Sequence, residues 1–247
     1  MVADDLAAAR ALPGPDYYTV LEWIHAALRP ITYVEIGVHS GKSLALARPD
    51  TFAIGIDPSP QPGDSFADSR IIRLTSSGFF RRYDLRQLLG GKAVDFALVD
   101  GLHLFEQAIE DLCNLERYIA PGGMIAVHDT IPLNRETSAR VRSTEFYTGD
   151  VWKMVPYLCQ HRPDLEIVTV LTAPTGLTLI RKFGLAQDDA GTPGSIDEFK
   201  ALEFDYFKRN QQEFLRTIPN QRPAVDAFCQ NTPVQSIASS GVAMPSC

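Results

Sequence analysis

The chain has 247 residues, of which 45% are hydrophobic and 21% charged, and its formal net charge is −7. The composition is typical of a globular protein, and the negative charge argues against a nucleic-acid or anionic-membrane binder, because neutralising phosphates requires a basic face. The four cysteines are scattered and include no CxxC pair, which favours a reduced, cytoplasmic setting over a zinc site or a disulfide framework.

Targeting segments are not predicted. Met1–Arg10 contains Asp4 and Asp5 and lacks the basic and apolar regions of a secretory signal. No run of about 18 apolar residues is present that could span a membrane. We therefore expect a cytoplasmic protein without a membrane partner.

The first half of the chain alternates between predicted helices and strands. Apolar residues at helical spacing predict a helix over 17–28, and short β-branched runs predict strands. The predicted strands are 31–36, 51–56 and 70–74. A helical stretch ending at residue 47 follows the first strand, and a helix over 83–89 ends at Gly90-Gly91.

The second half continues the alternation. The predicted strands are 94–99, 124–127, 166–171 and 177–181, and the predicted helices are 104–119, 151–160 and 195–216. The link between the last two strands is too short for a helical crossover, so we expect this pair to be antiparallel. The last helix carries an aromatic stripe that predicts self-association as a homodimer, with packing on its own domain as the alternative.

Five strands that alternate with helices imply an α/β fold with a parallel sheet covered on both faces. We expect one nucleotide-type domain over 31–183, preceded by a helical segment over 1–30. A C-terminal helical extension over 184–229 and a disordered tail over 230–247 follow. The long connection over 130–150 predicts a lid, because structureless connections of this length are usually functional or disordered.

A glycine-containing turn follows the first predicted strand. Gly37–Ser43 is similar to a phosphate-binding loop, but that pattern needs four residues between its glycines and three are present. The dinucleotide fingerprint G-x-G-x-x-G lacks its second glycine here. A third interpretation includes Glu35 and reads Glu35–Gly41 as E-x-G-x-x-x-G.

This third pattern resembles motif I of the Rossmann-like S-adenosylmethionine (SAM) methyltransferases. The resemblance implies that Glu35 and the loop hold the amino-acid end of the cofactor, and the loop residues concerned are Gly37, Val38, Ser40 and Gly41.

Two later residues extend the predicted cofactor site. Asp57 ends the next strand about 20 residues after Gly37, where an acid hydrogen-bonds ribose hydroxyls in nucleotide-binding sheets. A turn-forming role before Pro58 is the alternative. Ser76, after the third strand, is a candidate for the adenine region or for a plain turn.

A second set of motifs carries a more specific resemblance. D-G-x-H at 100–103, D-L at 111–112, and P-G-G followed by H-D over 121–129 resemble the Methyltransferase-24 family of small-molecule methyltransferases. The resemblance implies a Rossmann-like sheet of seven strands, mostly parallel with one antiparallel strand. It also implies SAM-dependent methylation of a small-molecule acceptor, most simply at an oxygen of a sugar or secondary metabolite.

The motif residues suggest how the acceptor is activated. An alcohol must lose its proton, and His103 and His128 are candidate bases because histidine titrates near pH 6.5. Asp129 is the third candidate catalytic residue. Asp100, at the end of its strand, is assigned both to the cofactor site and, with Asp129, to a candidate Mg²⁺ site. His128 stands where several related enzymes have a second acid, which argues against a tight divalent site. A structural role at the strand end is the alternative for this histidine.

Other roles are kept open at this point. The arginines of the predicted lid can meet an anionic acceptor or form a solvated face; they are Arg135, Arg140 and Arg142. A P-loop-like nucleotide-phosphate-binding protein is the alternative enzyme-class function. A SAM-binding fold that acts only as an interaction module is the non-catalytic alternative.

Overall fold

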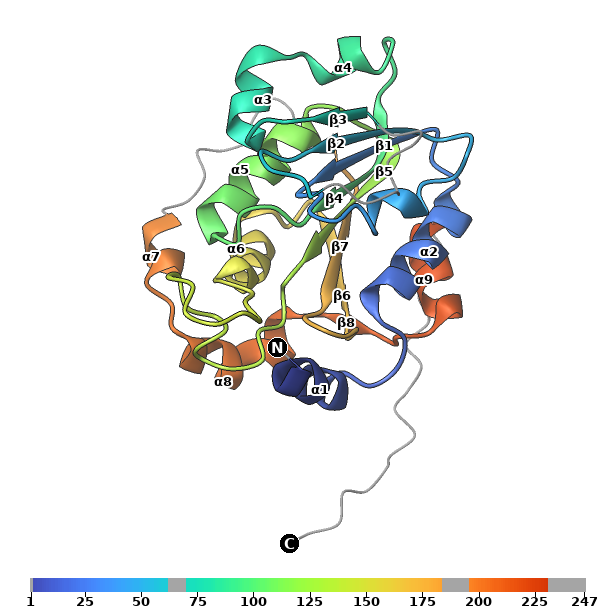
Figure 1. Cartoon of the computed structure of the whole chain (residues 1–247). Coiled ribbons are helices and arrows are strands. Elements are labelled where there is room, and N and C mark those ends of the chain that lie inside the picture. The colour runs from blue at the N-terminus through green and yellow to red at the C-terminus, as the bar shows by residue number, and fades with distance from the viewer. Residues whose placement is uncertain (1, 62–69, 184–195, 231–247) are drawn as a thin grey trace, which may run out of the picture.

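The computed structural model describes residues 2–61, 70–183 and 196–230, which form an eight-stranded sheet between two layers of helices (Figure 1). The strand order is β3-β2-β1-β4-β5-β7-β6-β8. The strands are β1 Thr32–Ile36, β2 Phe52–Ile56, β3 Arg70–Ile72, β4 Val94–Val99, β5 Ile119–His128, β6 Glu166–Val170, β7 Leu177–Arg181 and β8 Thr217–Ile218.

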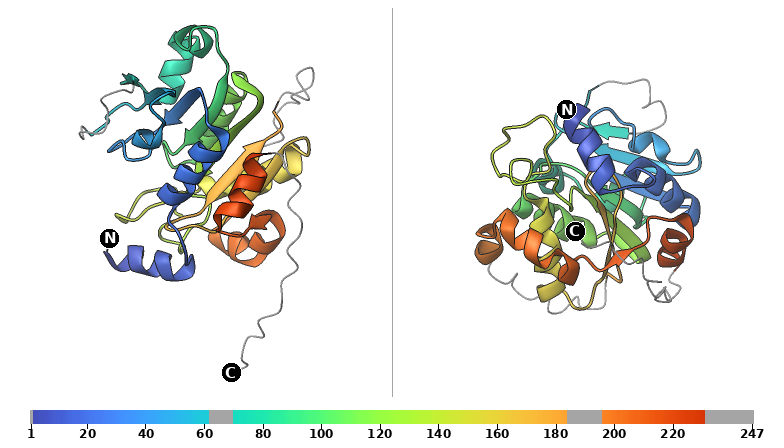
Figure 2. Two further views of the ribbon diagram at one scale, coloured as in Figure 1. Left: turned by 90° about the vertical axis from the view of Figure 1, so that its right-hand side faces the viewer. Right: turned by 90° about the horizontal axis from the view of Figure 1, so that it is seen from below.

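The helices cover both faces of this sheet. They are α1 Val2–Ala11, α2 Tyr17–Leu28, α3 Ser76–Arg82, α4 Leu85–Leu88, α5 Phe105–Glu116, α6 Met154–His161, α7 Ile196–Lys200, α8 Phe204–Phe214 and α9 Arg222–Cys229, with single 3-10 turns at Leu44–Leu46 and Val151–Lys153. Helices α3, α5, α6 and α8 lie on one face, and α2 and α9 lie together on the other (Figures 1 and 2). Each face has its own buried apolar cluster.

The predicted mixed sheet is confirmed. Strand β7 runs antiparallel to both β5 and β6, as the short connection between β6 and β7 requires. The count of seven strands was one too low, because β8 pairs parallel with β6 through Thr169↔Thr217 and Val170↔Ile218. A two-residue strand is too short to leave a periodic pattern in the sequence.

The helix predicted after the glycine loop is wrong in extent. Only the 3-10 turn Leu44–Leu46 forms there, and Ala47 already has extended backbone with ψ 136°. The helix cannot continue much further, because Pro49 disfavours the helical conformation of the residue before it, Arg48. The predicted helix over 83–89 is also shorter, since α4 spans Leu85–Leu88 and a separate helix, α3, begins at the Thr75 cap.

The single long helix predicted over 195–216 is two helices, because Glu203 adopts extended backbone between α7 and α8. Phe207 and Phe214 are buried, with ring centroids 5.3 and 6.5 Å from that of Trp152 on the same chain. The aromatic stripe therefore packs on its own domain and is not a free association surface. The predicted disordered tail lies outside the described residues after Gln230.

No helix in the described ranges is both long and apolar enough to cross a membrane.

Candidate functional site

A cavity of about 760 Å³ opens at the carboxyl ends of β1, β2, β4 and β5, where ligands bind in open α/β sheets. Residues from α2 and from the segment over 142–147 complete its wall. Most of the sequence-predicted site residues line it, namely Gly37, Val38, Ser40, Asp57, Ser76, Asp100, His103, His128 and Asp129.

The glycine loop packs closely against the residues that follow β4. Gly37 has φ +86°, and a Cβ atom at this position would overlap the carbonyl oxygen of Asp100. A side chain is therefore excluded by both backbone conformation and space. Gly37 also lines the cavity.

Asp57 holds the loop in place. One carboxylate oxygen accepts the backbone N–H of Val38 at 2.9 Å and that of His39 at 2.8 Å, and the other accepts the N–H of Ser59 at 2.7 Å. A carboxylate oxygen has two lone pairs, so the second oxygen can still accept a hydrogen bond from a ligand hydroxyl. Asp57 thus combines the predicted turn role with a position suited to ribose.

Glu35 and Gly41 are not among the residues that line the cavity. The Glu35 carboxyl group is fully buried and accepts hydrogen bonds from the Tyr33 hydroxyl at 2.6 Å and the Ser43 hydroxyl at 2.7 Å. Burial raises the pKa of Glu35 to about 8, although these two hydrogen bonds oppose the rise. Glu35 supports the loop from below and does not contact the cavity directly.

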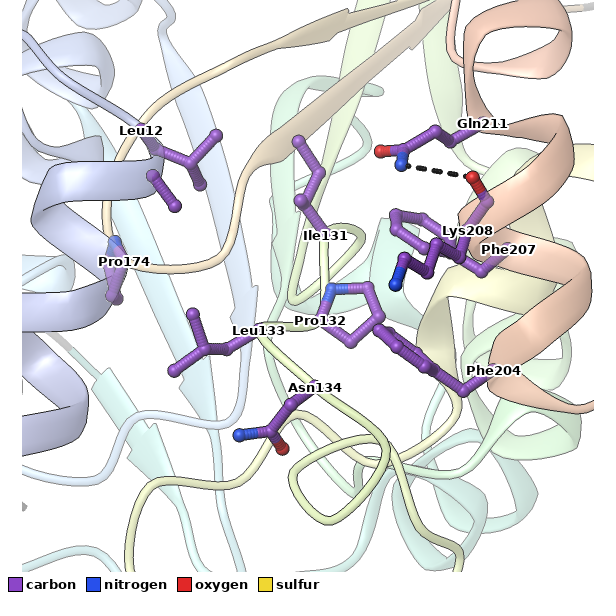
Figure 3. Close-up of a pocket in the computed structure, with 11 residues that line it drawn as sticks. Leu12, Ile131, Pro132, Leu133, Asn134, Pro174, Phe204, Phe207, Lys208 and Gln211 are labelled. Carbon is purple, nitrogen blue, oxygen red and sulfur yellow. Dashed lines mark hydrogen bonds between the residues drawn. The ribbon is translucent and has the colours of Figure 1, made fainter. Parts of the chain in front are cut away.

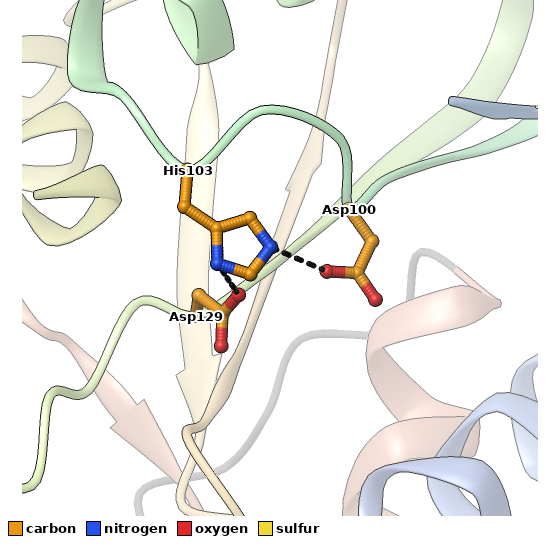
Figure 4. Close-up of side chains that lie close together, drawn as sticks. All are labelled: Asp100, His103 and Asp129. Atoms are coloured by element: carbon orange, nitrogen blue, oxygen red, sulfur yellow. Dashed lines mark ion pairs between the residues drawn. The ribbon is translucent and has the colours of Figure 1, made fainter. Parts of the chain in front are cut away.

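Four predicted residues meet at the ends of β4 and β5, and we call Asp100, His103, His128 and Asp129 the acid–histidine cluster. The ring of His103 stands between the two carboxylates, as Figure 4 shows. Its Nδ1 lies 3.1 Å from Asp129 Oδ2, and its Nε2 lies 3.8 Å from Asp100 Oδ1. The Nδ1 atom also lies 3.0 Å from the carbonyl oxygen of Tyr147. Because a carbonyl only accepts, this contact places a proton on Nδ1.

His128 is buried behind His103. Its Nδ1 lies 3.3 Å from Asp100 Oδ1 and 3.6 Å from Asp129 Oδ1, and its Nε2 lies 3.0 Å from the Thr175 hydroxyl. Burial lowers the pKa of His128, but the charges of Asp100 and Asp129 outweigh it and raise the pKa to about 9. His128 is therefore poorly suited to act as the base that the sequence suggested.

The two acids of the cluster differ in their surroundings. Burial acts to raise the pKa of Asp100, but the charge and hydrogen bond of His128 bring it below its usual value. Burial raises the pKa of Asp129, and the charges of His103 and His128 only partly oppose this. Asp129 also has φ +62°, a left-handed conformation that is rare for residues other than glycine. Strained backbone of this kind is concentrated at functional sites.

Several cavity residues were missed by the sequence reasoning. Tyr17 and Tyr18 come from the start of α2, Gln107 from α5 and Thr175 from the β6–β7 link. The Tyr17 ring stacks on His128, with centroids 4.0 Å apart. Two adjacent tyrosines after the Asp16 helix cap are the only local signal, and no local pattern places them beside β5.

The segment predicted as a lid contacts the cavity, and its three arginines have different surroundings. Arg142 lines the cavity, whereas Arg140 is paired with Asp150 and Glu106, each at 2.6 Å. Arg135 forms exposed pairs with Asp205 and Glu203 on the far side of the segment. Of the three, only Arg142 lies where it can meet an acceptor in this cavity.

A second cavity of about 420 Å³ lies between α1, the start of the 130–150 segment and α8 (Figure 3). Its wall is mostly apolar, with Lys208, Gln211 and Asn134 as its polar members. Pro174 lines both cavities. None of the predicted site residues lies in this second cavity.

Comparison with known proteins supports the motif analysis. Residues 34–130 match the model of the Methyltransferase-24 family, described as a methyltransferase domain. No curated protein sequence matches the chain.

Similar solved structures include a candidate caffeoyl-CoA O-methyltransferase from Staphylococcus aureus. It has a TM-score of 0.50 and 14% identity, over 72% of this chain and 90% of that chain. A Podospora anserina methyltransferase bound to S-adenosylhomocysteine has a TM-score of 0.49 and 15% identity, over 64% of this chain and 75% of that chain. A Bacillus cereus O-methyltransferase with the same ligand has a TM-score of 0.47 and 12% identity, over 71% of this chain and 86% of that chain. The first of these three supports the fold, and the predicted resemblance is confirmed. Residues 34–130 are therefore similar to the methyltransferase domain of the Methyltransferase-24 family, and the chain has a class I, Rossmann-like methyltransferase fold.

Proposed function

We propose that this chain transfers the methyl group of SAM to a hydroxyl oxygen of a small molecule, with His103 as the general base. The observation that carries the proposal is the His103 imidazole in the same cavity as the glycine loop, with its Nδ1 held beside Asp129. When bound, SAM would supply a methyl group that is open to in-line attack. The protein residues then have to align the two reactants and remove one proton.

The cofactor side of the cavity fits SAM. Gly37 lines the cavity and packs so closely on the backbone of Asp100 that no side chain fits there. Asp57 and Ser76 both line the cavity, and we assign Asp57 to the ribose hydroxyls and Ser76 to the adenine region. The lowered pKa of Asp100 keeps it negatively charged, and a negative charge favours a cationic sulfonium ligand.

His103 is oriented for proton removal. Its Nδ1–H is held by the Tyr147 carbonyl and lies against Asp129, which leaves Nε2 as the basic nitrogen. This histidine is about one quarter exposed, with a side-chain exposure of 27%, so an acceptor can reach it. Asp129 is then a positioning residue that holds the ring and stabilises the charge that forms on it.

The acceptor side of the cavity combines apolar and hydrogen-bonding surface from Tyr18, Leu102, Phe146 and Tyr147. Such a lining suits a small molecule that carries hydroxyl groups on an apolar or ring-shaped body. A sugar or a phenolic or alcoholic secondary metabolite has this character. The net charge of −7 favours such a partner over a nucleic acid.

The direct test measures S-adenosylhomocysteine binding by calorimetry and then methyl transfer from SAM to a panel of hydroxylated small molecules. We expect His103→Gln to lower kcat by about 100-fold or more while the affinity for S-adenosylhomocysteine changes less than about threefold. His161→Gln, outside the cavity, is the matched control. Tight binding of Mg²⁺-ATP without S-adenosylhomocysteine binding would instead favour the P-loop interpretation. Binding of S-adenosylhomocysteine with no transfer to any acceptor would favour the non-catalytic interaction module.

Three coarser expectations are part of the proposal. We expect the protein to work in the cytoplasm, to form a homodimer, and to fold with residues 31–183 as its cofactor-binding unit. Size-exclusion chromatography with light scattering tests the dimer.

A further inference from the structure

We infer that two histidine side chains, His103 and His128, join the carboxylates of Asp100 and Asp129 in place of a divalent metal ion, so that the acid–histidine cluster holds no such ion. The absence of a metal site can be tested without knowing the reaction. Only the catalytic role of the cluster rests on the proposed function. The acids themselves suit a hard cation, since Asp100, His103 and Asp129 each offer a ligand atom within 4.8 Å of the others. The question is what already occupies the space between them.

The ring of His103 is placed as a bridge and not as a metal ligand. Each of its two nitrogens faces a different carboxylate, at 3.1 Å for Asp129 and 3.8 Å for Asp100 (Figure 4). An imidazole binds a metal ion through one nitrogen, with the carboxylate ligands converging on the same point. Here the ring lies between the carboxylates, and its Nδ1–H is already held by the Tyr147 carbonyl.

The hydrogen bonds of His128 place a proton on each of its nitrogens. The Thr175 hydroxyl has one hydrogen and donates it to Asp129 Oδ1 at 2.7 Å. Its oxygen therefore accepts at the 3.0 Å contact with His128, which makes Nε2 a donor. The other nitrogen, Nδ1, faces oxygens of both carboxylates at 3.3 and 3.6 Å, so it is a donor as well.

A positively charged ring thus contacts both acids, with its Nδ1 3.3 Å from Asp100 Oδ1 and 3.6 Å from Asp129 Oδ1. A metal ion beside it would meet a like charge at short range, in a buried setting where screening is weak. The ring cannot easily move away, because it is 6% exposed and stacked on Tyr17 with 19° between the ring planes. The charged ring of His128 compensates part of the negative charge that would attract a divalent ion.

The experiment titrates Mn²⁺ into the full-length protein and follows the free ion by electron paramagnetic resonance. For the wild type we expect no stoichiometric binding up to about 1 mM. For His128→Asp, which replaces the ring by a third carboxylate, we expect one ion with a Kd below about 100 µM. The double variant His128→Asp with Asp100→Asn should lose this binding, and His161→Asp should not gain it.

Two results would overturn the inference. One is a wild-type protein that binds one Mn²⁺ with a Kd below about 100 µM and loses it in Asp129→Asn. The other is a folded His128→Asp variant, verified by circular dichroism, that binds no Mn²⁺. The wild-type titration decides the question even if the variant does not fold. Calorimetry with S-adenosylhomocysteine on the same samples is independent of the ion, so a failure of the proposed function is recognised separately.

Discussion

The imidazole of His128 lies against the ring of Tyr17, with centroids 4.0 Å apart and 19° between the planes. Tyr17 begins α2, which precedes the segment matched by the methyltransferase family. Its backbone N–H also donates to the carbonyl oxygen of Ala173, in the β6–β7 link that carries Thr175. Helix α2 therefore contributes to a site whose other residues come from the matched domain, the 142–147 segment and this link.

Loss of the Tyr17 ring should weaken both the fold and the cluster. We expect Tyr17→Ala to lower the free energy of unfolding by about 3 kcal/mol, because it removes a buried aromatic ring and its contact with a charged imidazole. Tyr17→Phe keeps the ring and should cost about 1 kcal/mol or less. Urea unfolding of both variants checks this. Equal losses in the two variants would assign the effect to the hydroxyl and not to the stack.

Gly37 should tolerate no side chain. Gly37→Ala places a methyl group against the Asp100 carbonyl at a φ of +86°, so we expect more than about tenfold weaker S-adenosylhomocysteine binding and a lower melting temperature. Gly91→Ala is the matched control, since Gly91 has φ +87° but no heavy atom within 4 Å of an added Cβ. It should cost only about 1 kcal/mol and leave binding unchanged. Similar binding losses in both variants would contradict the role assigned to close packing at Gly37.

The buried carboxyl group of Glu35 should make stability depend on pH. Its folded pKa is about 8, against an ordinary value of 4.5, so the folded state keeps a proton that the unfolded chain releases. This contribution to stability is therefore lost as pH rises from about 4.5 to about 8, by up to about 1.4 kcal/mol per pH unit.

Glu35→Gln resembles the protonated side chain and should remove this dependence. We expect the variant to gain stability relative to the wild type as pH rises from 5.5 to 7.5, by about 1–3 kcal/mol. Urea unfolding across this range measures the difference, and the exposed Glu22→Gln serves as control. A constant difference between wild type and Glu35→Gln would show that Glu35 is ionised in the folded protein.

The two paired arginines of the 130–150 segment should differ in effect. Arg140 pairs with Asp150, whose side chain is 1% exposed, whereas the Arg135 pairs are open to solvent. We expect Arg140→Gln to cost about 1–2 kcal/mol and to speed hydrogen exchange across this segment. Arg135→Gln should change stability by about 0.5 kcal/mol or less. Unchanged exchange in Arg140→Gln would mean that other contacts hold the segment.

Local pattern was sufficient for most of the sheet. The predicted strand over 94–99 and helix over 17–28 have the same bounds in the structure. Both are recognised from residues close together in the sequence, one by an apolar run and the other by apolar residues at helical spacing. The antiparallel pairing of β6 and β7 followed from the short connection between them. The last predicted helix was wrong, because Glu203 has extended backbone and divides it into two helices. The helical spacing of apolar residues continues across this break, so the pattern does not reveal it.

The sequence by itself determined the methyltransferase motifs, their order, and the strand ends at which they lie, since these depend on residue type and spacing along the chain. Only the tertiary structure decided what the motif residues contact. It buried Glu35 beneath the loop and brought Thr175 and Tyr17 to His128. Protonation and hydrogen bonding depend on such contacts between residues that are distant in sequence. The proposed division of roles between His103 and His128 therefore depends on contacts that only the fold creates.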